Sequence, residues 1–498
     1  MNKHSQRMSA SRIVFHPRLC LRPHVLALAA AVLVAGCSVS PVYQVPATPA
    51  PAQFKEMQGW VPAAPADALE RGPWWTLFGD PVLNDLVASV EVSNQNVAAA
   101  VAAYAQARAL VAEQRAALFP SVTLNGSGTR SGARGGGGAA TVDANGNIIG
   151  GSGGGDVRNN YRLSVGGSWE PDVWGRLRAG VTAASAQAQA SAADLAAARL
   201  SAQGELALDY VSLRSVDAQR ALLATTIEGY ERELRITQNR YNAGIIAHTD
   251  VYQAETQLAT ARSDELSLVS QRAQLEHAIA VLVGKAPAEF SLAVAPWNVT
   301  VPEVPVGVPA TLLQRRPDIA SAERRVASAN EQIGIARSAY FPDVGLSANY
   351  ATAASRIGDL LNASAATWSF GLSAAQTLFD AGATRARVES ARAAQEQAAA
   401  NYRQTVLTAF ADVENQLAAT RVLAQQQELR RQASEAADKV EQQVLNRYRA
   451  GQVSYTDVVT AQITALNARR NLIQSQADRQ TTAIALIQSL GGGWHTQP

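Results

Sequence analysis

Histidine and cysteine are common in catalytic and metal sites, and this 498-residue chain contains few of either. Downstream of residue 36 the histidines are far apart in the sequence, at His248, His277 and His495. No two of them have the spacing of a metal site, and the glycines at 491–493 are not followed by the Lys-Ser/Thr of a phosphate-binding loop. We therefore expect no catalytic centre, no enzyme activity and no metal or other cofactor.

Cys37 stands where a leader peptide would be cleaved. Residues 1–36 carry five basic residues and no acidic one, and they contain a short apolar run that ends in small residues. Such a run favours a signal peptide over a membrane-spanning helix. The run and its cysteine resemble a bacterial lipobox, which implies that Cys37 becomes an acylated N-terminus in the outer membrane. The alternative is an ordinary cleavage site beside an unrelated cysteine. The other cysteine, Cys20, would leave with the leader, so the mature chain cannot form an internal disulfide.

The composition argues against nucleic-acid binding. The formal net charge is +2 for the whole chain and becomes −3 once residues 1–36 are removed. A slightly acidic chain offers no electrostatic attraction to phosphates. Residues 37–73 are rich in Pro and Ala, which predicts an extended tether without a fold of its own.

A pattern rich in Tyr, Gly and Asp occurs twice, at residues 240–251 and 447–458. The offset is 207 residues, and the self-match runs from 161 to 284 without a gap. A self-match of this length indicates a duplicated unit. The first copy carries 15 additional residues, all between 120 and 161.

The two copies of this pattern predict the tips of two helical hairpins. Gly244 and Gly451 are suited to end a helix, because glycine adopts the left-handed conformation readily. Asp250 and Asp457, each preceded by Thr, are suited to be the N-caps of the returning helices. Capping alone could explain both carboxylates. The functional alternative is that symmetry gathers several copies of each at the entrance of a pore.

Long helices must carry these tips. Residues 175–241 and 382–448 each predict a helix of about 67 residues, or roughly 100 Å. Shorter helices are predicted at 80–118 and 249–284 in the first copy and at 311–341 and 456–490 in the second. Stacked end to end, each pair nearly matches the long helix and could lie antiparallel beside it. The apolar stripe is sharpest in the second copy, at Tyr402, Val406, Ala409, Val413 and Leu417.

At the opposite ends of the helices the apolar period changes to two, which predicts strands at 120–130, 161–171, 342–352 and 366–377. Residues 126–158 are Gly-rich and predict an exposed loop. One face of the last strand carries Trp368, Phe370 and Leu372. Such strands match membrane β-strands in length, although hairpins on a soluble core are the general alternative. Four strands cannot close a usable barrel, so a membrane role requires several chains.

The remaining segments complete the expected domains. The first repeat spans 74–284 and the second 311–491. A Pro-rich connector at 285–310 joins them, with short strands considered near 290–294, and residues 492–498 form a C-terminal tail.

Several motifs resemble those of one family. They are Leu312-Leu313-Gln314-Arg315-Arg316-Pro317-Asp318-Ile319, Ala322-Glu323-Arg324-Arg325, Ala339-Tyr340-Phe341-Pro342 and the turn at 169–178. They resemble TolC-like outer membrane factors, in particular the OprM-like, NodT-type lipoproteins of RND efflux pumps, over nearly the whole mature chain. The resemblance implies an α + membrane β fold. In it a homotrimer forms a 12-stranded outer-membrane β-barrel, and a long periplasmic α-helical barrel continues it.

The same resemblance implies a function and its residues. The chain would be the passive exit channel of a tripartite system, with a periplasmic membrane-fusion adaptor, an inner-membrane RND transporter and outer-membrane lipid as partners. The entrance residues would be Asp250, Asp457, Tyr241, Tyr448, Arg447 and Gln452. The adaptor-facing tip residues would be Gly244, Thr249, Gly451 and Thr456. Gln452 replaces a basic residue of some relatives, and crowded copies of Asp457 would favour cations. The alternatives are a duct for type I protein secretion and a coiled-coil lipoprotein without a pore.

Overall fold

The computed structural model describes residues 39–48, 51, 53–56, 73–132, 141–142, 148–149, 157–302, 304, 316–362 and 366–492. The chain divides into two compact units. The sheet unit comprises Met1–Ser40, Ala116–Ala179 and Gly334–Thr384, and the helical unit comprises Pro41–Arg115, Gly180–Ile333 and Arg385–Pro498. Cys37, Arg315 and the tail from residue 493 lie outside the described residues, and so do most of the loop between 133 and 156.

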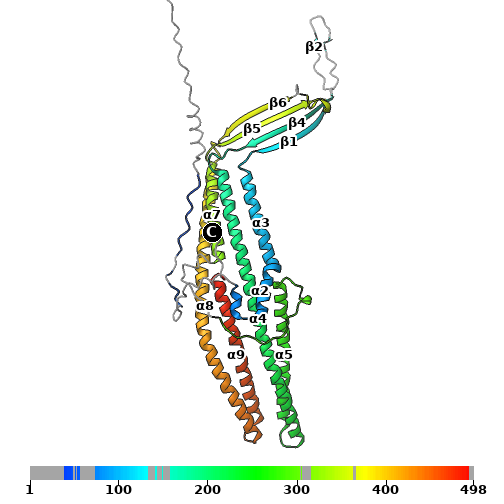
Figure 1. The fold of residues 1–498 in the computed structure, drawn as a ribbon, viewed down its shortest axis with the longest axis vertical. Helices are drawn as coiled ribbons and strands as arrows, with labels where there is room; N and C mark the ends of the chain where they lie inside the picture. The colour runs from blue at the N-terminus through cyan, green and yellow to red at the C-terminus, as the bar shows by residue number, and fades with distance from the viewer. Residues whose placement is uncertain are drawn as a thin grey trace, which may run out of the picture. The chain divides into compact units, whose positions relative to one another are not determined.

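Long antiparallel helices form the helical unit (Figure 1). The bounds are α2 Pro81–Ser93, α3 Gln95–Ala116, α4 Arg176–Asn242, α5 His248–Leu282, α7 Pro317–Ser338, α8 Ala383–Arg449 and α9 Tyr455–Ser489. The short helices α2, α3 and α5 lie along α4, while α7 and α9 lie along α8, as the repeat pattern predicts. The predicted stripe of α8, from Tyr402 to Leu417, is buried in the main hydrophobic core.

The duplication is confirmed by matching lengths and turns. α4 and α8 each have 67 residues, and α5 and α9 each have 35. Glycines with positive φ occur in pairs that are 207 residues apart: Gly175 and Gly382, Gly244 and Gly451, Gly284 and Gly491. The same backbone turns therefore occur at the same places in both copies.

The prediction of one continuous helix over 80–118 is wrong, because the helix breaks at Asn94. The Asn94 side chain accepts hydrogen bonds from the backbone N–H groups of Asn96 and Val97, at 2.9 and 3.1 Å. Its amide donates to the carbonyl of Leu282. Asn94 thus ends α2, caps α3 and fastens the break to the end of α5, which an apolar spacing pattern cannot reveal.

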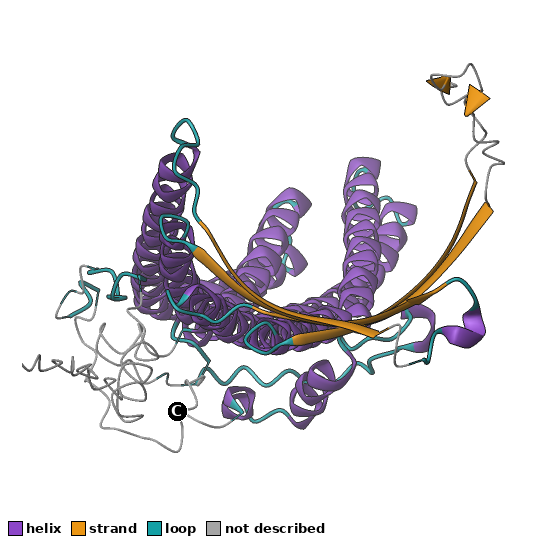
Figure 2. Ribbon diagram, turned by 90° about the horizontal axis from the view of Figure 1, so that it is seen from above, coloured by secondary structure: helices purple, strands orange, loops and turns teal. Residues whose placement is uncertain are grey.

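The sheet unit contains four antiparallel strands in the order β1–β4–β5–β6. Their bounds are β1 Ser121–Gly132, β4 Val157–Trp169, β5 Asp343–Ala354 and β6 Ala366–Ala375. The pairing of β4 with β5 joins the hairpins of the two repeats into one curved sheet (Figure 2). A short pair, β2 Thr141–Val142 and β3 Ile148–Ile149, lies between β1 and β4 in the sequence.

The prediction of an exposed loop from residue 126 onward is wrong for its two ends. Residues 126–132 continue β1, and β4 already begins at Val157. Gly128 pairs with Tyr161, and a Cβ added at Gly128 would lie 3.2 Å from the tyrosine ring. The ring therefore covers the glycine, and the ladder of backbone hydrogen bonds supports a stretch whose own side chains predict no strand.

The tether, which was expected to be loosely attached, is held on the helical unit. The tether has no helix or strand at residues 41–48, but Phe54 is buried against Phe410 with ring centroids 6.5 Å apart. The carboxylate of Glu414 also accepts the backbone N–H groups of Lys55 and Glu56. Residues 53–56 are therefore anchored to α8 and are not simply a free linker.

The short strands considered at 290–294 are absent from the described connector, and buried charges hold its backbone in their place. Arg214 donates to the carbonyl of Ala293, at 2.8 Å, and Arg272 donates to that of Leu292. Asp217 forms ion pairs with both arginines, at 3.2 and 2.8 Å. This buried network fixes the connector to α4 and α5.

Candidate functional site

The two hairpin tips end in the glycine turns that the sequence predicts. In the first tip the N–H of Gly244 donates to Tyr241 O and that of Ile245 to Arg240 O. In the second, the N–H of Gly451 donates to Tyr448 O and that of Gln452 donates to Arg447 O. Both glycines have φ above +70°. These are Schellman turns, in which a left-handed glycine satisfies carbonyls at the helix end.

The prediction that Asp250 and Asp457 are N-caps is wrong by three residues. Ser454 is the N-cap of α9, and Asp457 completes a capping box with it. The corresponding N-cap of α5 is Ala247, which has no side chain to cap with, and Asp250 lies in the first turn. The hydrogen bonds from Ser454 lower the pKa of Asp457, so this exposed carboxylate stays charged.

Aromatic rings line both tips. In the first tip His248 lies between Tyr241 and Tyr252, with ring centroids 4.5 and 4.2 Å away. In the second, Tyr448 lies 5.5 Å from Tyr455. Burial is the main cause that raises the pKa of Tyr448, and the charge of the nearby Asp250 adds to it. The fold therefore brings Asp250 of the first tip close to Tyr448 of the second, but Tyr241 belongs to a separate cluster.

Three contacts join the first hairpin to the second near the tips. The guanidinium of Arg240 lies 5.0 Å from the centre of the Tyr448 ring, as in a cation–π pair. Gln253 of α5 donates to Thr456 of α9, at 3.2 Å. Farther from the tips, Glu233 of α4 accepts from Gln462 of α9.

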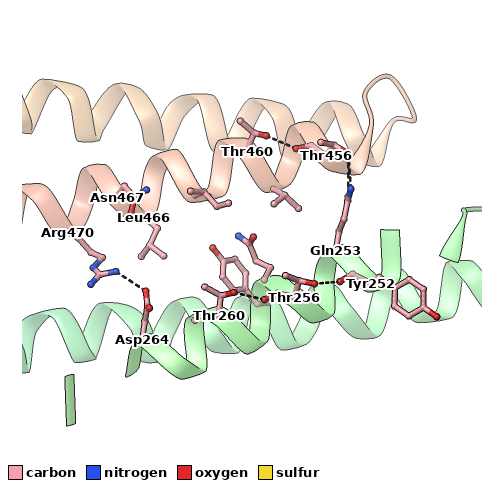
Figure 3. A pocket seen from close by; sticks show the side chains of 15 residues that line it. Tyr252, Gln253, Thr256, Thr260, Asp264, Thr456, Thr460, Leu466, Asn467 and Arg470 are labelled. Carbon is pink, nitrogen blue, oxygen red and sulfur yellow. Dashed lines mark hydrogen bonds and ion pairs between the residues drawn. The ribbon is translucent and has the colours of Figure 1, made fainter. Parts of the chain in front are cut away.

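A groove with a volume of about 510 Å³ runs between α5 and α9 (Figure 3). Its walls carry short polar side chains such as Thr256, Thr260 and Thr460. The Gln253–Thr456 hydrogen bond crosses it near the tips, and the Arg470–Asp264 ion pair, at 3.0 Å, crosses it farther along. Its lining is mostly apolar, with Val459, Ile463 and Leu466 on α9, and the polar groups are set along it.

The remaining predicted tip residues are exposed. Arg447, Gln452 and Thr249 lie on the surface of the tips. Sequence reasoning missed Arg240, Glu233 and Gln462. Arg240 could have been found, since it precedes Tyr241 as Arg447 precedes Tyr448. Glu233 and Gln462 could not, because their counterparts 207 residues away are Val440 and Glu255.

The described residues form neither a metal centre nor a membrane-spanning helix. No group of three or more His, Cys, Asp or Glu residues there is placed to hold a metal ion. No helix in that part of the chain is long and apolar enough to span a bilayer.

The duplicated hairpins and the shared sheet define a class of protein with an α + β fold built from two repeats. The sequence matches the family described as outer membrane efflux protein over residues 86–285 and 308–492. The chain belongs to this family.

Individual relatives cover nearly the full length. The toluene efflux pump outer membrane protein TtgC of Pseudomonas putida is 31% identical over 471 residues, which are 94% of this chain and 95% of the relative. The cation efflux system protein CusC of Escherichia coli is 28% identical, over 95% of this chain and 98% of the relative. The solved structure of the outer-membrane channel OprN is 29% identical with a TM-score of 0.81, covering 92% of this chain and all of that one.

Proposed function

We propose that this chain is the outer-membrane exit channel of a tripartite efflux system and conducts small molecules passively. The observation that carries this function is the full-length match to outer-membrane efflux proteins, together with the same duplicated fold. The relatives are named for toluene and for cation efflux at similar identity. We infer that the pump selects the substrate and that the channel conducts whatever the pump delivers.

The sheet supports a homotrimer. In the single chain β1 and β6 are edge strands, and Trp368, Phe370 and Leu372 are 81%, 70% and 71% exposed. Unpaired edges and a bare apolar face are not tolerated together in water or in lipid. Three chains would supply 12 strands, pair every edge and turn the apolar faces toward lipid.

The tips support an entrance on the periplasmic side. In a trimer, symmetry would bring three copies of each tip together, with Asp457 held charged by its capping box. The links of Arg240 to Tyr448 and of Gln253 to Thr456 would hold the two hairpins of each chain in place. We propose the groove between α5 and α9, with its apolar lining and its polar crossing contacts, as the surface that meets the periplasmic adaptor.

We propose Cys37 as the lipid-bearing N-terminus. Cys37 lies 17 residues before Phe54, which packs on Phe410 of α8. An acyl chain at Cys37 would therefore be joined to the helical unit through a segment that is anchored at Phe54. Replacing Cys37 by Ser should remove the acyl mass from the purified protein. An unchanged mass would refute the assignment.

Efflux is tested in cells. Deleting the gene should raise dye accumulation, and re-expression should reverse it. The variant Asp457→Ala then reports on the entrance. If accumulation of a broad dye and drug panel is unchanged, the efflux function is refuted, and a protein missing from the culture supernatant would point to secretion.

The membrane face is tested with paired substitutions on β6. Phe370→Lys and Leu372→Lys should each cost about 2–4 kcal/mol of barrel stability if these faces meet lipid. Ser369→Lys and Ser373→Lys on the other face are the matched controls and should leave the trimer intact. Equal trimer yields for both pairs, measured by mass in detergent, would refute the lipid-facing assignment.

A further inference from the structure

Glu233 lies on α4 near the tip of the first hairpin and faces the second. Both of its carboxylate oxygens lie within hydrogen-bond distance of Nε2 of Gln462 on α9, at 2.8 and 2.7 Å. α4 and α9 belong to different hairpins. Any movement of one hairpin away from the other must therefore break this contact.

The surroundings of Glu233 disfavour its charge. The titratable and charged groups that face it are Tyr230 on α4, Glu441, Tyr448 and Arg449 on α8, and Tyr455 on α9. Glu441 is itself paired with Arg469, at 2.6 Å. Within the described part of the chain, no basic side chain comes within ion-pair distance of Glu233.

These surroundings raise the pKa of Glu233. Burial is the main cause, and the charge of Glu441 adds to it. The hydrogen bond from Gln462 and the charge of Arg449 act in the opposite direction and do not cancel the effect.

The pair is also incomplete as a hydrogen-bonded unit. Oε1 of Gln462 is buried and has no donor. An ionised carboxylate accepts only and cannot supply one, so a buried acceptor is left unpaired. A protonated carboxyl group has the missing donor. With the Gln462 amide rotated toward it, its O–H would donate to Oε1, while Nε2–H donates to the carbonyl oxygen.

We propose that Glu233 and Gln462 form a proton-dependent latch between the two hairpins, which closes when Glu233 takes a proton from the solvent. The inference rests on the proposed function only in that the tips are taken as the channel entrance. Before protonation the Gln462 amide group donates and both oxygens of Glu233 accept. After protonation each side chain donates one hydrogen bond and accepts one, so a proton is the only reactant needed.

The sign of the pH dependence follows from proton linkage. A released Glu233 would titrate near its ordinary value of 4.5, whereas the latched one binds its proton more tightly. The latched form is thus most favoured below that value and loses its advantage as the pH rises through the raised pKa. One proton changes the ratio of latched to released forms by at most about tenfold per pH unit.

Spin-label distances can measure this directly. Arg235 on α4 and Thr464 on α9 are exposed and can be replaced by Cys for labelling. The chain has two cysteines of its own, Cys20 and Cys37, both in the N-terminal segment. Mixing labelled chain with excess unlabelled chain isolates the distance within one chain.

The proposal predicts a short distance in the native sequence at pH 4.5 and a growing longer population toward pH 7.5. Glu233→Gln, which can donate and accept without titrating, should keep the short distance at every pH. Gln462→Ala should show the longer population at every pH. Asp264→Asn removes a different contact between hairpins and should keep the pH response of the native sequence.

Two results would overturn the latch: native distances that are the same at pH 4.5 and 7.5, or a Glu233→Gln variant that responds to pH as the native chain does. Conductance of the same proteins in planar bilayers separates this from the proposed function. A pH-dependent distance without conductance in any variant would support the latch and count against the channel. Conductance with pH-independent distances would support the channel and reject the latch.

Discussion

Removal of the Asp217 carboxylate should be among the most destabilising single changes in the helical unit. Asp217 is 5% exposed and pairs with Arg214, which is 2% exposed, and with Arg272. In Asp217→Ala, Arg272 keeps Glu276, but Arg214 loses its one carboxylate partner and keeps the carbonyl of Ala293 and the ring of Tyr210, whose centre lies 4.8 Å from the guanidinium. Breaking a buried ion pair from one side costs about 3–5 kcal/mol, because the other charge stays buried.

An exposed pair of the same chemistry is the control. Arg470 and Asp264 are 30% and 42% exposed, and such pairs contribute about 0–1 kcal/mol. The two losses can be compared in urea titrations of the purified protein, followed by helical circular dichroism. Amide exchange should also speed up at Leu292, whose N–H donates to Glu276 beside the network. The double replacement Arg214→Met with Asp217→Leu should recover most of the loss, since it buries no charge.

A stability loss below about 1 kcal/mol in Asp217→Ala, or a loss no larger than that in Asp264→Ala, would contradict a stabilising role of the buried charges. Either result would mean that water reaches Arg214 once its partner is gone. The connector would then be held by its backbone packing and not by the charge network.

Two further changes test smaller features of the helical unit. Ala247→Ser should create, with Asp250, the capping box that Ser454 forms with Asp457 in the other tip. A cap of this kind contributes about 0.5–2 kcal/mol, so the melting temperature should rise. An unchanged or lower melting temperature would contradict the assignment of Ala247 as the N-cap. Asp209→Asn tests a carboxyl whose pKa is raised to about 6, mainly by burial and also by Glu205. A raised pKa in the folded state means that the native chain loses stability as the pH rises from about 4 to about 6. The asparagine variant has no such loss, so its melting temperature minus that of the native chain should increase over this range. A difference that does not change with pH would contradict the raised pKa of Asp209.

Features set by local chemistry were predictable. The offset of 207 residues located the pairs of left-handed glycines, because a Schellman turn needs little more than glycine after the last helical turn. Both ends of α4, α8 and α9 lie within one residue of the prediction, because the helices stop at those turns. The family and its exit-channel function also followed from sequence motifs.

Features that depend on a distant partner were not predictable. β1 continues through 131–132, beyond the predicted strand end at 130, because Arg158 and Val157 of β4 complete the ladder, although this segment has no apolar alternation. The tether gained a buried anchor because Glu414 and Phe410, more than 300 residues away, accept Phe54 and the two N–H groups that follow it. One error was local: Asp457 lies in the first turn because Ser454, three residues earlier, is the N-cap and bonds to it, and Asp250 has the same place after Ala247.

The sequence by itself determined the duplication, which a comparison of the chain with itself reveals. It also determined the lengths of the long helices and the turns at the tips, since these depend on residues within a few positions of one another. Only the tertiary structure decided which strands pair, where α2 gives way to α3, and that Glu233 meets Gln462. Those outcomes depend on contacts between residues far apart in the chain, and the partly buried Glu233 carboxylate acquires its altered affinity for a proton only when such contacts exclude water.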